Sequence, residues 1–296
     1  MEKGELKRWQ EVCSYAAETM SFLRKTVKPE MPLVELAEKF EDRIEKKGFS
    51  SAFPISLSVG NTVAHYTPSH NDPLKAEGLI KIDMGVAKDG YLSDTASSVD
   101  LTPENRFKDL IKAGEEATKD AIKAFKIGVE FGEIGRIIED KIASLDLVSI
   151  KNLSGHSIEK WKVHAGLIVP NYNNKDQHKI TEGIYAIEPF ATTGDPRVID
   201  GGGPNIWIIN KAKPVRIGRE IIQFIEKEYK TLPFSSRWIA KKFGSQSLIT
   251  LAKLEQQGIL HHYRELTKKN KEFTTHYEHS VAALEDKTIV LTQRED

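Results

Sequence analysis

The chain has 296 residues, of which 39% are hydrophobic and 29% are charged, with 43 basic against 43 acidic side chains. This composition predicts a globular protein of one large or two ordinary domains, and the zero net charge gives no general attraction to nucleic acid or membranes. One cysteine excludes an internal disulfide framework, and the absence of a signal-like start or an apolar run near the roughly 18 residues of a membrane span predicts a cytoplasmic protein.

Two helices are predicted at the start of the chain. Residues 5–26 have helical character, and residues 33–47 place Leu36, Phe40 and Ile44 at the four-residue spacing of one helix face. These side chains are apolar, so we expect that face to be buried.

A second pair of predicted helices, over residues 104–126 and 133–145, repeats the arrangement. The later helix aligns with the earlier one at an offset of 98 residues, which places Ile134, Ile138 and Ile142 at the positions of the apolar face. The repeat predicts two similar α+β halves, and a crevice between two such halves is a common location for a site.

Between the helix pairs, residues 81–95 (KIDMGVAKDGYLSDT) predict a β-hairpin that carries two aspartates. If the pairing centres on Lys88 and Asp89, Asp83 and Asp94 lie directly opposite each other, with Cβ atoms roughly 5 Å apart. A bulge in the turn would shift this register. Two carboxylates held together among apolar residues require protons or cations, whereas a solvated hairpin face would need neither.

Residues 216–262 depart from this alternation of helices and strands. Three short stretches predict three helices, and residues 216–272 carry 12 Lys and Arg against 6 Asp and Glu. The small basic module has features of a winged helix, but we interpret it as an inserted surface subdomain that reads no specific DNA. The predicted organisation is therefore a main domain of residues 1–215 and 263–296 with an inserted helical subdomain of residues 216–262.

Five further polar residues in the strand-like regions can carry chemistry. They are His65, His156, His164, Glu188 and Glu278. A lone histidine in an apolar stretch is more often a hydrogen-bonded core residue, and a lone glutamate is usually solvated. Together with the aspartate pair, however, they supply four carboxylates and an imidazole, a ligand set that suits Mn²⁺, Fe²⁺, Co²⁺ or Zn²⁺. Two such ions would cancel the four negative charges.

At these residues the chain resembles type II methionine aminopeptidases, in the short form without a charged N-terminal extension. The motifs that carry the resemblance are AFP at 52, AHYTP at 64, KIDMGV…GYLSDT at 81, NLSGH at 152, HAG at 164, AIEPFAT at 186 and EH at 278. Prolidases and aminopeptidase P share the ligand set, whereas the AFP and AHYTP contexts favour the methionine enzymes, and the helical insertion is the mark of type II. Ser56 and Gly60 stand where relatives often carry asparagine, near the expected entrance, and this departure bears on fine specificity.

The resemblance implies the pita-bread fold, an α+β arrangement of two pseudo-symmetric halves, with a dinuclear metal site. Asp83 would bind one ion with both of its oxygens. His156 and Glu188 would be terminal ligands of the other ion, and Asp94 and Glu278 would bridge the two.

The remaining implied roles concern the substrate. His65 and His164 resemble the two histidines that contact the substrate without binding metal, and Glu188 is the candidate that carries a proton to the leaving amine. Phe53 and Phe190 would line the methionine pocket, where a thioether packs well against aromatic rings.

The implied activity is removal of the N-terminal methionine from nascent proteins when the second residue is small, through attack of a metal-activated water on the first peptide bond. One alternative is a prolidase-like enzyme, which assays on Met-Ala and Xaa-Pro substrates would separate. Another is an inactive binding protein whose basic insertion contacts ribosomal RNA, but all five ligand positions are filled here. We expect a monomer with at most weak ribosome contact and no membrane or specific DNA binding.

Overall fold

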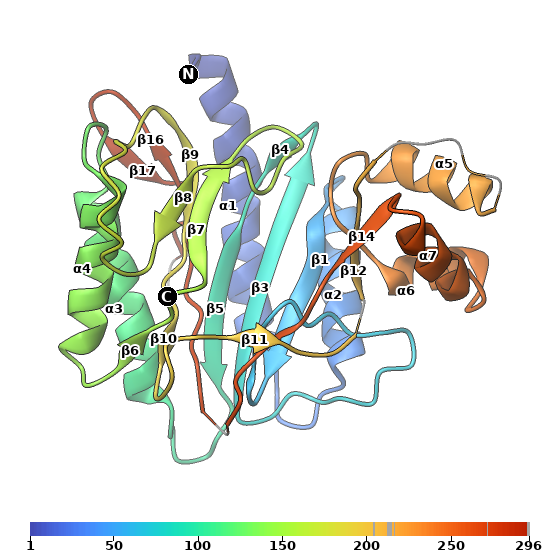
Figure 1. The fold of residues 1–296 in the computed structure, drawn as a ribbon, viewed down its shortest axis with the longest axis horizontal. Coiled ribbons are helices and arrows are strands. Elements are labelled where there is room, and N and C mark those ends of the chain that lie inside the picture. Colours follow the sequence, from blue (N-terminus) through green and yellow to red (C-terminus); the bar gives the residue numbers. More distant parts are fainter. Residues whose placement is uncertain (204, 212–214, 216, 271, 295–296) are drawn as a thin grey trace.

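Two antiparallel β-sheets form the centre of the protein, as the computed structural model shows over the residues that it describes, 1–203, 205–211, 215, 217–270 and 272–294 (Figure 1). The first sheet contains β1 (Ser50–Val59), β3 (Leu79–Lys88), β4 (Tyr91–Leu92) and β5 (Thr95–Asp100). The second sheet contains, in spatial order, β17 (Thr288–Val290), β16 (His279–Ala283), β9 (Gly183–Ile187), β7 (Ser154–Ile158) and β8 (Ile168–Pro170).

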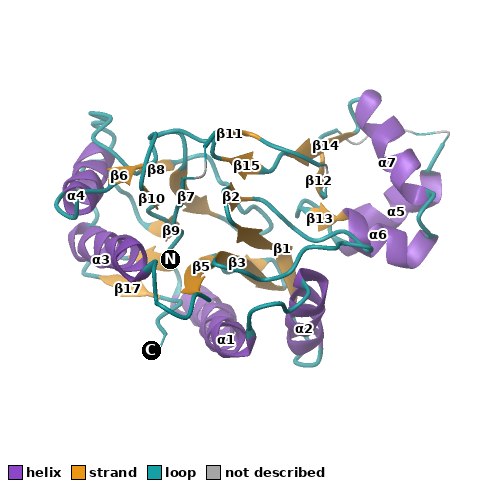
Figure 2. Cartoon of the chain, turned by 90° about the horizontal axis from the view of Figure 1, so that it is seen from below, coloured by secondary structure: helices purple, strands orange, loops and turns teal. Residues whose placement is uncertain are grey.

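Two helices flank each sheet, one pair below the first sheet and the other pair at the left beside the second (Figure 2). They are α1 (Lys3–Thr26), α2 (Leu33–Glu45), α3 (Lys108–Ala124) and α4 (Phe131–Ala143). All four predicted helices are present, with ends shifted by at most four residues. The predicted apolar faces of α2 and α4 are buried, which removes their side chains from water and stabilises the packing of helices on strands.

The two halves repeat each other as the sequence predicts. Helix α4 spans the residues of α2 at an offset of 98. The strand bridge that precedes each helix is also repeated, because Glu30 N–H donates to Ala76 O and Gly128 N–H donates to Ile180 O, both at 2.9 Å. The repeat is therefore a property of the backbone as well as of the apolar pattern.

Strand β5 and the segment that leads into β16 join the two halves through serine and threonine hydroxyls. Asp94 N–H donates to Ser280 Oγ (2.9 Å), and the Ser280 hydroxyl donates to Asp94 O (2.7 Å). The Thr95 hydroxyl donates to Glu278 O (2.9 Å). These bonds replace a regular strand ladder and hold residues 94 and 278 side by side at the junction.

The predicted register of the aspartate hairpin is wrong by one residue on each strand. Lys88 pairs with Tyr91 across a two-residue turn in which Asp89 and Gly90 both have positive φ (53° and 86°), as a type I′ turn requires. Asp83 is consequently opposite Ala96 and not Asp94. The same register places residue 94 opposite residue 85, so the two aspartates are diagonal neighbours on one face.

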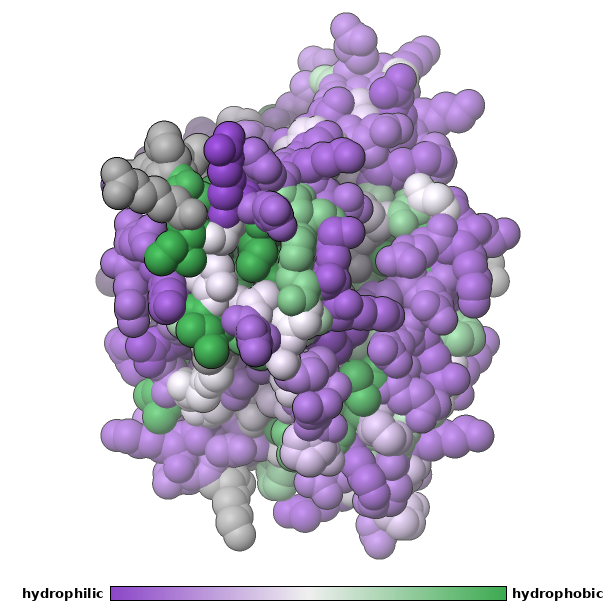
Figure 3. Space-filling model, turned by 90° about the vertical axis from the view of Figure 1, so that its right-hand side faces the viewer, coloured by the Kyte–Doolittle hydropathy of each residue, from purple (hydrophilic) through white to green (hydrophobic). Residues whose placement is uncertain are grey.

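The helical subdomain contains α5 (Arg219–Glu228), α6 (Ser236–Phe243) and α7 (Ser247–Gln256), packed on a small sheet of β13 (Phe234–Ser235), β12 (Ile206–Ile209) and β14 (Leu260–Tyr263). Its packed unit begins before the predicted boundary, because β12 pairs with β14 and Trp207 belongs to the subdomain core. Residue 216, the predicted boundary itself, lies outside the described residues. The face that the subdomain presents is mostly hydrophilic, with a limited group of apolar side chains (Figure 3).

Two smaller sheets complete the main domain. One pairs β10 (Ala191–Thr192) with β6 (Val148–Ser149), and the other contains β11 (Ile199–Asp200), β15 (Leu266–Thr267) and β2 (Thr62–Ala64). In the part of the chain that the structure describes, no helix is both long enough and apolar enough to cross a membrane.

Candidate metal centre

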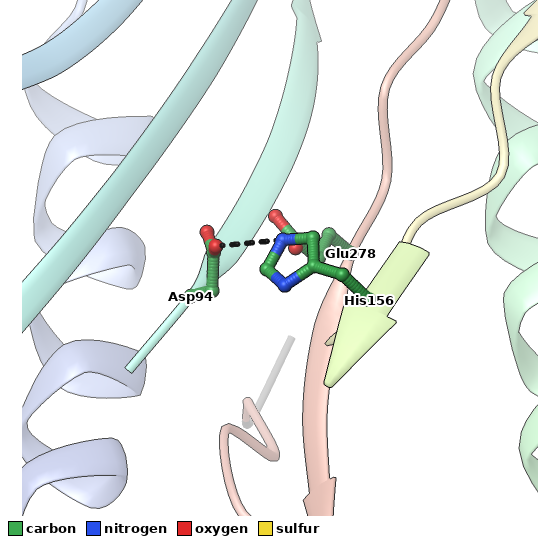
Figure 4. Close-up of side chains that lie close together, drawn as sticks. All are labelled: Asp94, His156 and Glu278. Atoms are coloured by element: carbon green, nitrogen blue, oxygen red, sulfur yellow. Dashed lines mark ion pairs between the residues drawn. The ribbon is translucent and has the colours of Figure 1, made fainter. Parts of the chain in front are cut away.

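The structure brings the five predicted ligands together at the junction of the two halves. Asp83 lies in β3, Asp94 precedes β5, His156 lies in β7, Glu188 follows β9 and Glu278 precedes β16. Figure 4 shows three of these side chains pointing toward one another. His156 Nε2 lies 3.4 Å from Asp94 Oδ2 and 3.6 Å from Glu188 Oε1.

The carboxylates are too closely packed to be stable as four uncompensated anions. Asp83 Oδ1 and Glu278 Oε2 are buried and make no hydrogen bond among the described residues. Burial, followed by the charge of Asp94, raises the pKa of Asp83, of Glu188 and of Glu278 well above the ordinary carboxyl value. Unpaired buried oxygens of this kind are costly unless protons or cations neutralise them, so the residues fit a group of divalent ions.

Gly85 leaves room for an aromatic ring beside the aspartates. A Cβ at this position would lie 2.5 Å from the Phe53 ring and 2.6 Å from Ser93 O, so any larger residue would displace one of them. Because residue 85 has no side chain, the Phe53 ring can lie next to the carboxylates.

The two histidines predicted to contact substrate also face the cluster. The His164 ring lies 4.3 Å from the His156 ring between centroids. His164 is exposed to solvent, but desolvation by the surrounding protein, followed by the charges of His156 and His65, lowers its pKa. Burial also lowers the pKa of His65, whose Nδ1 lies 3.2 Å from Arg264 O. Both rings are consequently neutral near pH 7 and can each donate one N–H.

The loop that carries His164 is fixed to the aspartate hairpin. Trp161 N–H donates to Gly90 O at 2.9 Å. A Cβ on Gly90 would lie 2.2 Å from Trp161 Nε1. The backbone of Gly90 also has positive φ, so both the space and the conformation require glycine. The hairpin thus positions an aspartate and a histidine of the site together.

Two cavities meet at the cluster. The smaller, of about 70 Å³, has carboxylates at one end and apolar walls that include Phe53, Val163, Ile206, Pro233 and Tyr263. The larger, of about 290 Å³, is lined on its other sides by residues 152–154 and 166–168. Glu188 and the histidines at 65, 156 and 164 line both cavities.

The two phenylalanines predicted for one pocket lie in different places. Phe53 lines the smaller cavity, whereas Phe190 lines the larger one. The reason is that Phe190 is buried against Val63, Ile150 and Val198. Phe53 and Phe190 therefore line neighbouring cavities that share the carboxylate cluster, and their predicted contact with the substrate stays a prediction.

Two residues near the cluster were missed at the sequence level. His276 is buried beside Glu188 and Glu278, and it is recognisable as the residue two before Glu278 on an extended segment, where alternate side chains share a face. Tyr263 reaches the cavity from β14, with its ring 5.8 Å from His65 and 6.4 Å from His164 between centroids. No local pattern marks Tyr263, because β14 reaches the cavity only through the packing of the subdomain.

The profile of metallopeptidase family M24 matches residues 7–223. The chain belongs to metallopeptidase family M24. A methionine aminopeptidase of Pyrococcus abyssi is 42% identical over 276 residues, which cover 91% of this chain and 93% of that protein. The prediction of a metallopeptidase related to methionine aminopeptidases is therefore confirmed.

Solved structures agree on the fold of this M24 protein. A methionine aminopeptidase from Rickettsia prowazekii has a TM-score of 0.71 at 20% identity and covers 99% of this chain and 98% of its own. A thermophilic Arx1 has a TM-score of 0.86 at 13% identity and covers 98% and 91%. The predicted pita-bread fold is confirmed by these similarities, which at such identity concern the fold alone.

Proposed function

We propose that this M24 protein removes the N-terminal methionine from polypeptides whose second residue is small, and that Asp83, Asp94, His156, Glu188 and Glu278 hold two divalent ions for that purpose. One observation carries the proposal: four carboxylates and an imidazole converge at the end of a cavity with apolar walls. The close relatives named methionine aminopeptidase support the same substrate.

The positions of the side chains support the ligand roles that the resemblance implies. Asp94 and Glu278 lie at the junction between the halves, where a carboxylate would be within reach of both ions. Asp83 extends from the first sheet and is assigned to one ion; His156 and Glu188 extend from the second sheet and are assigned to the other. Oxygen-rich sets with an imidazole suit Co²⁺, Mn²⁺, Fe²⁺ or Zn²⁺.

When bound, the ions would supply Lewis-acid polarisation of the scissile carbonyl and would lower the pKa of water. Glu188, which faces both cavities, would take the proton of the attacking water and pass it to the leaving amine. His164, in its neutral form, would donate its N–H to the carbonyl oxygen as negative charge develops there. His65 would hold the substrate backbone on the opposite side of the cavity.

The two cavities divide the substrate between them. The smaller cavity would take the methionine side chain, whose flexible thioether packs well against Phe53 and Tyr263. The wider cavity would take the chain that follows the first peptide bond. The free α-amino group of the substrate would bind beside the ions and would restrict cleavage to the first residue.

The helical subdomain would control access to the pocket, and it would take no part in the reaction itself. Pro233 and Ile206 of this region form part of the pocket wall, and the basic excess of residues 216–272 would allow a weak, salt-sensitive contact with ribosomal RNA. We propose a cytoplasmic monomer that acts on emerging chains, with no specific DNA contact.

A paired assay tests the function against its prolidase-like alternative. The metal-loaded protein is incubated with Met-Ala-Ser and, separately, with Xaa-Pro dipeptides, and free methionine or free proline is measured. We expect methionine release from the first substrate and little proline release from the second. Preferential cleavage of Xaa-Pro would reject the methionine assignment and leave the metal site intact.

A further inference from the structure

We propose that His276 is an additional metal ligand of this centre, so that the site contains two imidazoles in place of one. The inference rests on the proposed dinuclear site and adds a residue to it. It concerns the ion assigned to Glu188 and Glu278.

The spacing of three ligand atoms supports this role. His276 Nε2 lies 3.2 Å from Glu188 Oε2 and 3.7 Å from Glu278 Oε2. Ligand atoms about 2.1 Å from one ion are about 3.0 Å apart in octahedral geometry and about 3.4 Å apart in tetrahedral geometry. The distances of 3.2 and 3.7 Å therefore agree with a shared ion to within a few tenths of an ångström.

The hydrogen bonding of the same atoms excludes a simpler role. His276 is 2% exposed, and its Nε2 makes no hydrogen bond among the described residues although a carboxylate oxygen is close by. Glu278 Oε2 is equally buried and equally without a hydrogen bond. A histidine that only oriented Glu188 would direct its N–H at an oxygen, whereas atoms arranged around a cation need no such alignment.

The imidazole is held rigidly in this position. The backbone of His276 exchanges two hydrogen bonds with Ser98, since its N–H donates to Oγ (2.9 Å) and its carbonyl accepts from Oγ (3.0 Å). Its ring stacks on Phe190 with centroids 4.1 Å apart and planes 21° from parallel. Phe190 thus supports the ring of His276.

His279 provides a contrast within the same segment. It is also buried, but its Nδ1 lies 3.0 Å from Thr292 Oγ1, which is a normal hydrogen-bond distance. The orphaned nitrogen of His276 is therefore specific to its position beside the carboxylates. A second imidazole shifts the preference of an oxygen-rich site toward Co²⁺, Ni²⁺ and Zn²⁺ and away from Mn²⁺.

X-ray absorption at the zinc edge measures the number of imidazoles directly. The metal-free protein is loaded at a Zn²⁺ concentration that fills both sites in every variant, as calorimetric titration establishes, and the wild type is compared with His276→Gln, His156→Gln and the matched control His279→Gln. We expect about one imidazole per ion on average in the wild type and in the control, and about half of that in each of the other two variants. The dissociation constant of the affected ion, from calorimetric titration, should rise more than about 10-fold in His276→Gln.

The outcomes distinguish the proposed role of His276 from the existence of the metal centre itself. If the wild type shows about half an imidazole per ion, unchanged in His276→Gln and lost in His156→Gln, the inference is wrong while the proposed centre stands. A wild type that binds no zinc overturns both. If His276→Gln fails to fold, the imidazole that remains in His156→Gln decides, because it can come from His276 and would be absent under the single-imidazole site.

Discussion

Arg237 of helix α6 holds Glu41 of helix α2 through two parallel hydrogen bonds of 2.7 and 2.8 Å. The Arg237 side chain is 3% exposed and that of Glu41 is 13% exposed. Trp238 Nε1 donates a third bond to the same carboxylate (2.7 Å). This pair attaches the helical subdomain to the main domain.

Glu41→Gln should therefore destabilise the protein. Removal of one charge leaves the guanidinium buried without its partner, which typically costs about 3–5 kcal/mol. Denaturant unfolding measures the loss, and Glu38→Gln, an exposed change on the same helix, should alter the free energy of unfolding by less than about 0.5 kcal/mol. Equal stability of the two variants would show that the pair contributes nothing to docking.

Removal of metal should abolish peptide cleavage. The four carboxylates repel one another without cations, and the activation of water depends on the ions. Dialysis against a chelator should leave folded, inactive protein, and added Mn²⁺ or Co²⁺ should restore cleavage of Met-Ala-Ser. Full activity in protein shown by elemental analysis to be metal-free would contradict the dinuclear site.

The bridging and terminal carboxylates should differ in metal content. Asp94→Ala or Glu278→Ala should lose both ions, because each carboxylate is assigned to the two of them, whereas Asp83→Ala should weaken mainly one. Asp89→Asn is the control, since it lies in the turn of the same hairpin with positive φ, which asparagine tolerates. Metal per chain is measured after gel filtration, and full occupancy in Asp94→Ala would disprove the bridge.

The affinity for metal should rise with pH. The raised pKa values of Asp83, Glu188 and Glu278 mean that the metal-free site binds protons above the ordinary carboxyl range near pH 4, and an incoming ion must displace them. Affinity is thus lost as the pH falls through the raised values and is gained as it rises through them. Calorimetry in two buffers of different ionisation enthalpy should detect proton release on metal binding above the ordinary carboxyl range, and its absence would contradict the raised values.

Local patterns in the sequence were sufficient for the helices, and the motifs of the resemblance named the five residues whose side chains converge. The faces of α2 and α4 repeat every three to four residues, and each ligand lies in a short motif. The hairpin register was wrong because it depends on which two residues adopt positive φ, and the pattern allowed either pair. The subdomain boundary at β12 and the position of Tyr263 depend on strand pairings between distant residues, which no local pattern contains.

His276 and Phe190 illustrate a different limit. The sequence shows that His276 lies two residues before Glu278. It becomes a candidate ligand only because the structure shows its Nε2 buried and without a hydrogen bond among the described residues. The resemblance placed Phe190 near the substrate because of its motif. Its stacking on His276 is a property of this chain that the motif does not encode.

The sharpest prediction separates His156 from His164, whose rings are 4.3 Å apart and whose roles are expected to differ. His156→Ala should release one ion and lose activity that added metal restores only in part. His164→Ala should keep nearly full metal content and lose kcat by roughly 10²- to 10³-fold, about 3–4 kcal/mol, because it removes a donor to the developing oxyanion. KM should change much less, since the methionine pocket remains. A packing role for His164 would instead lower the melting temperature with little kinetic loss, and loss of metal from His164→Ala but not from His156→Ala would reverse the assignment.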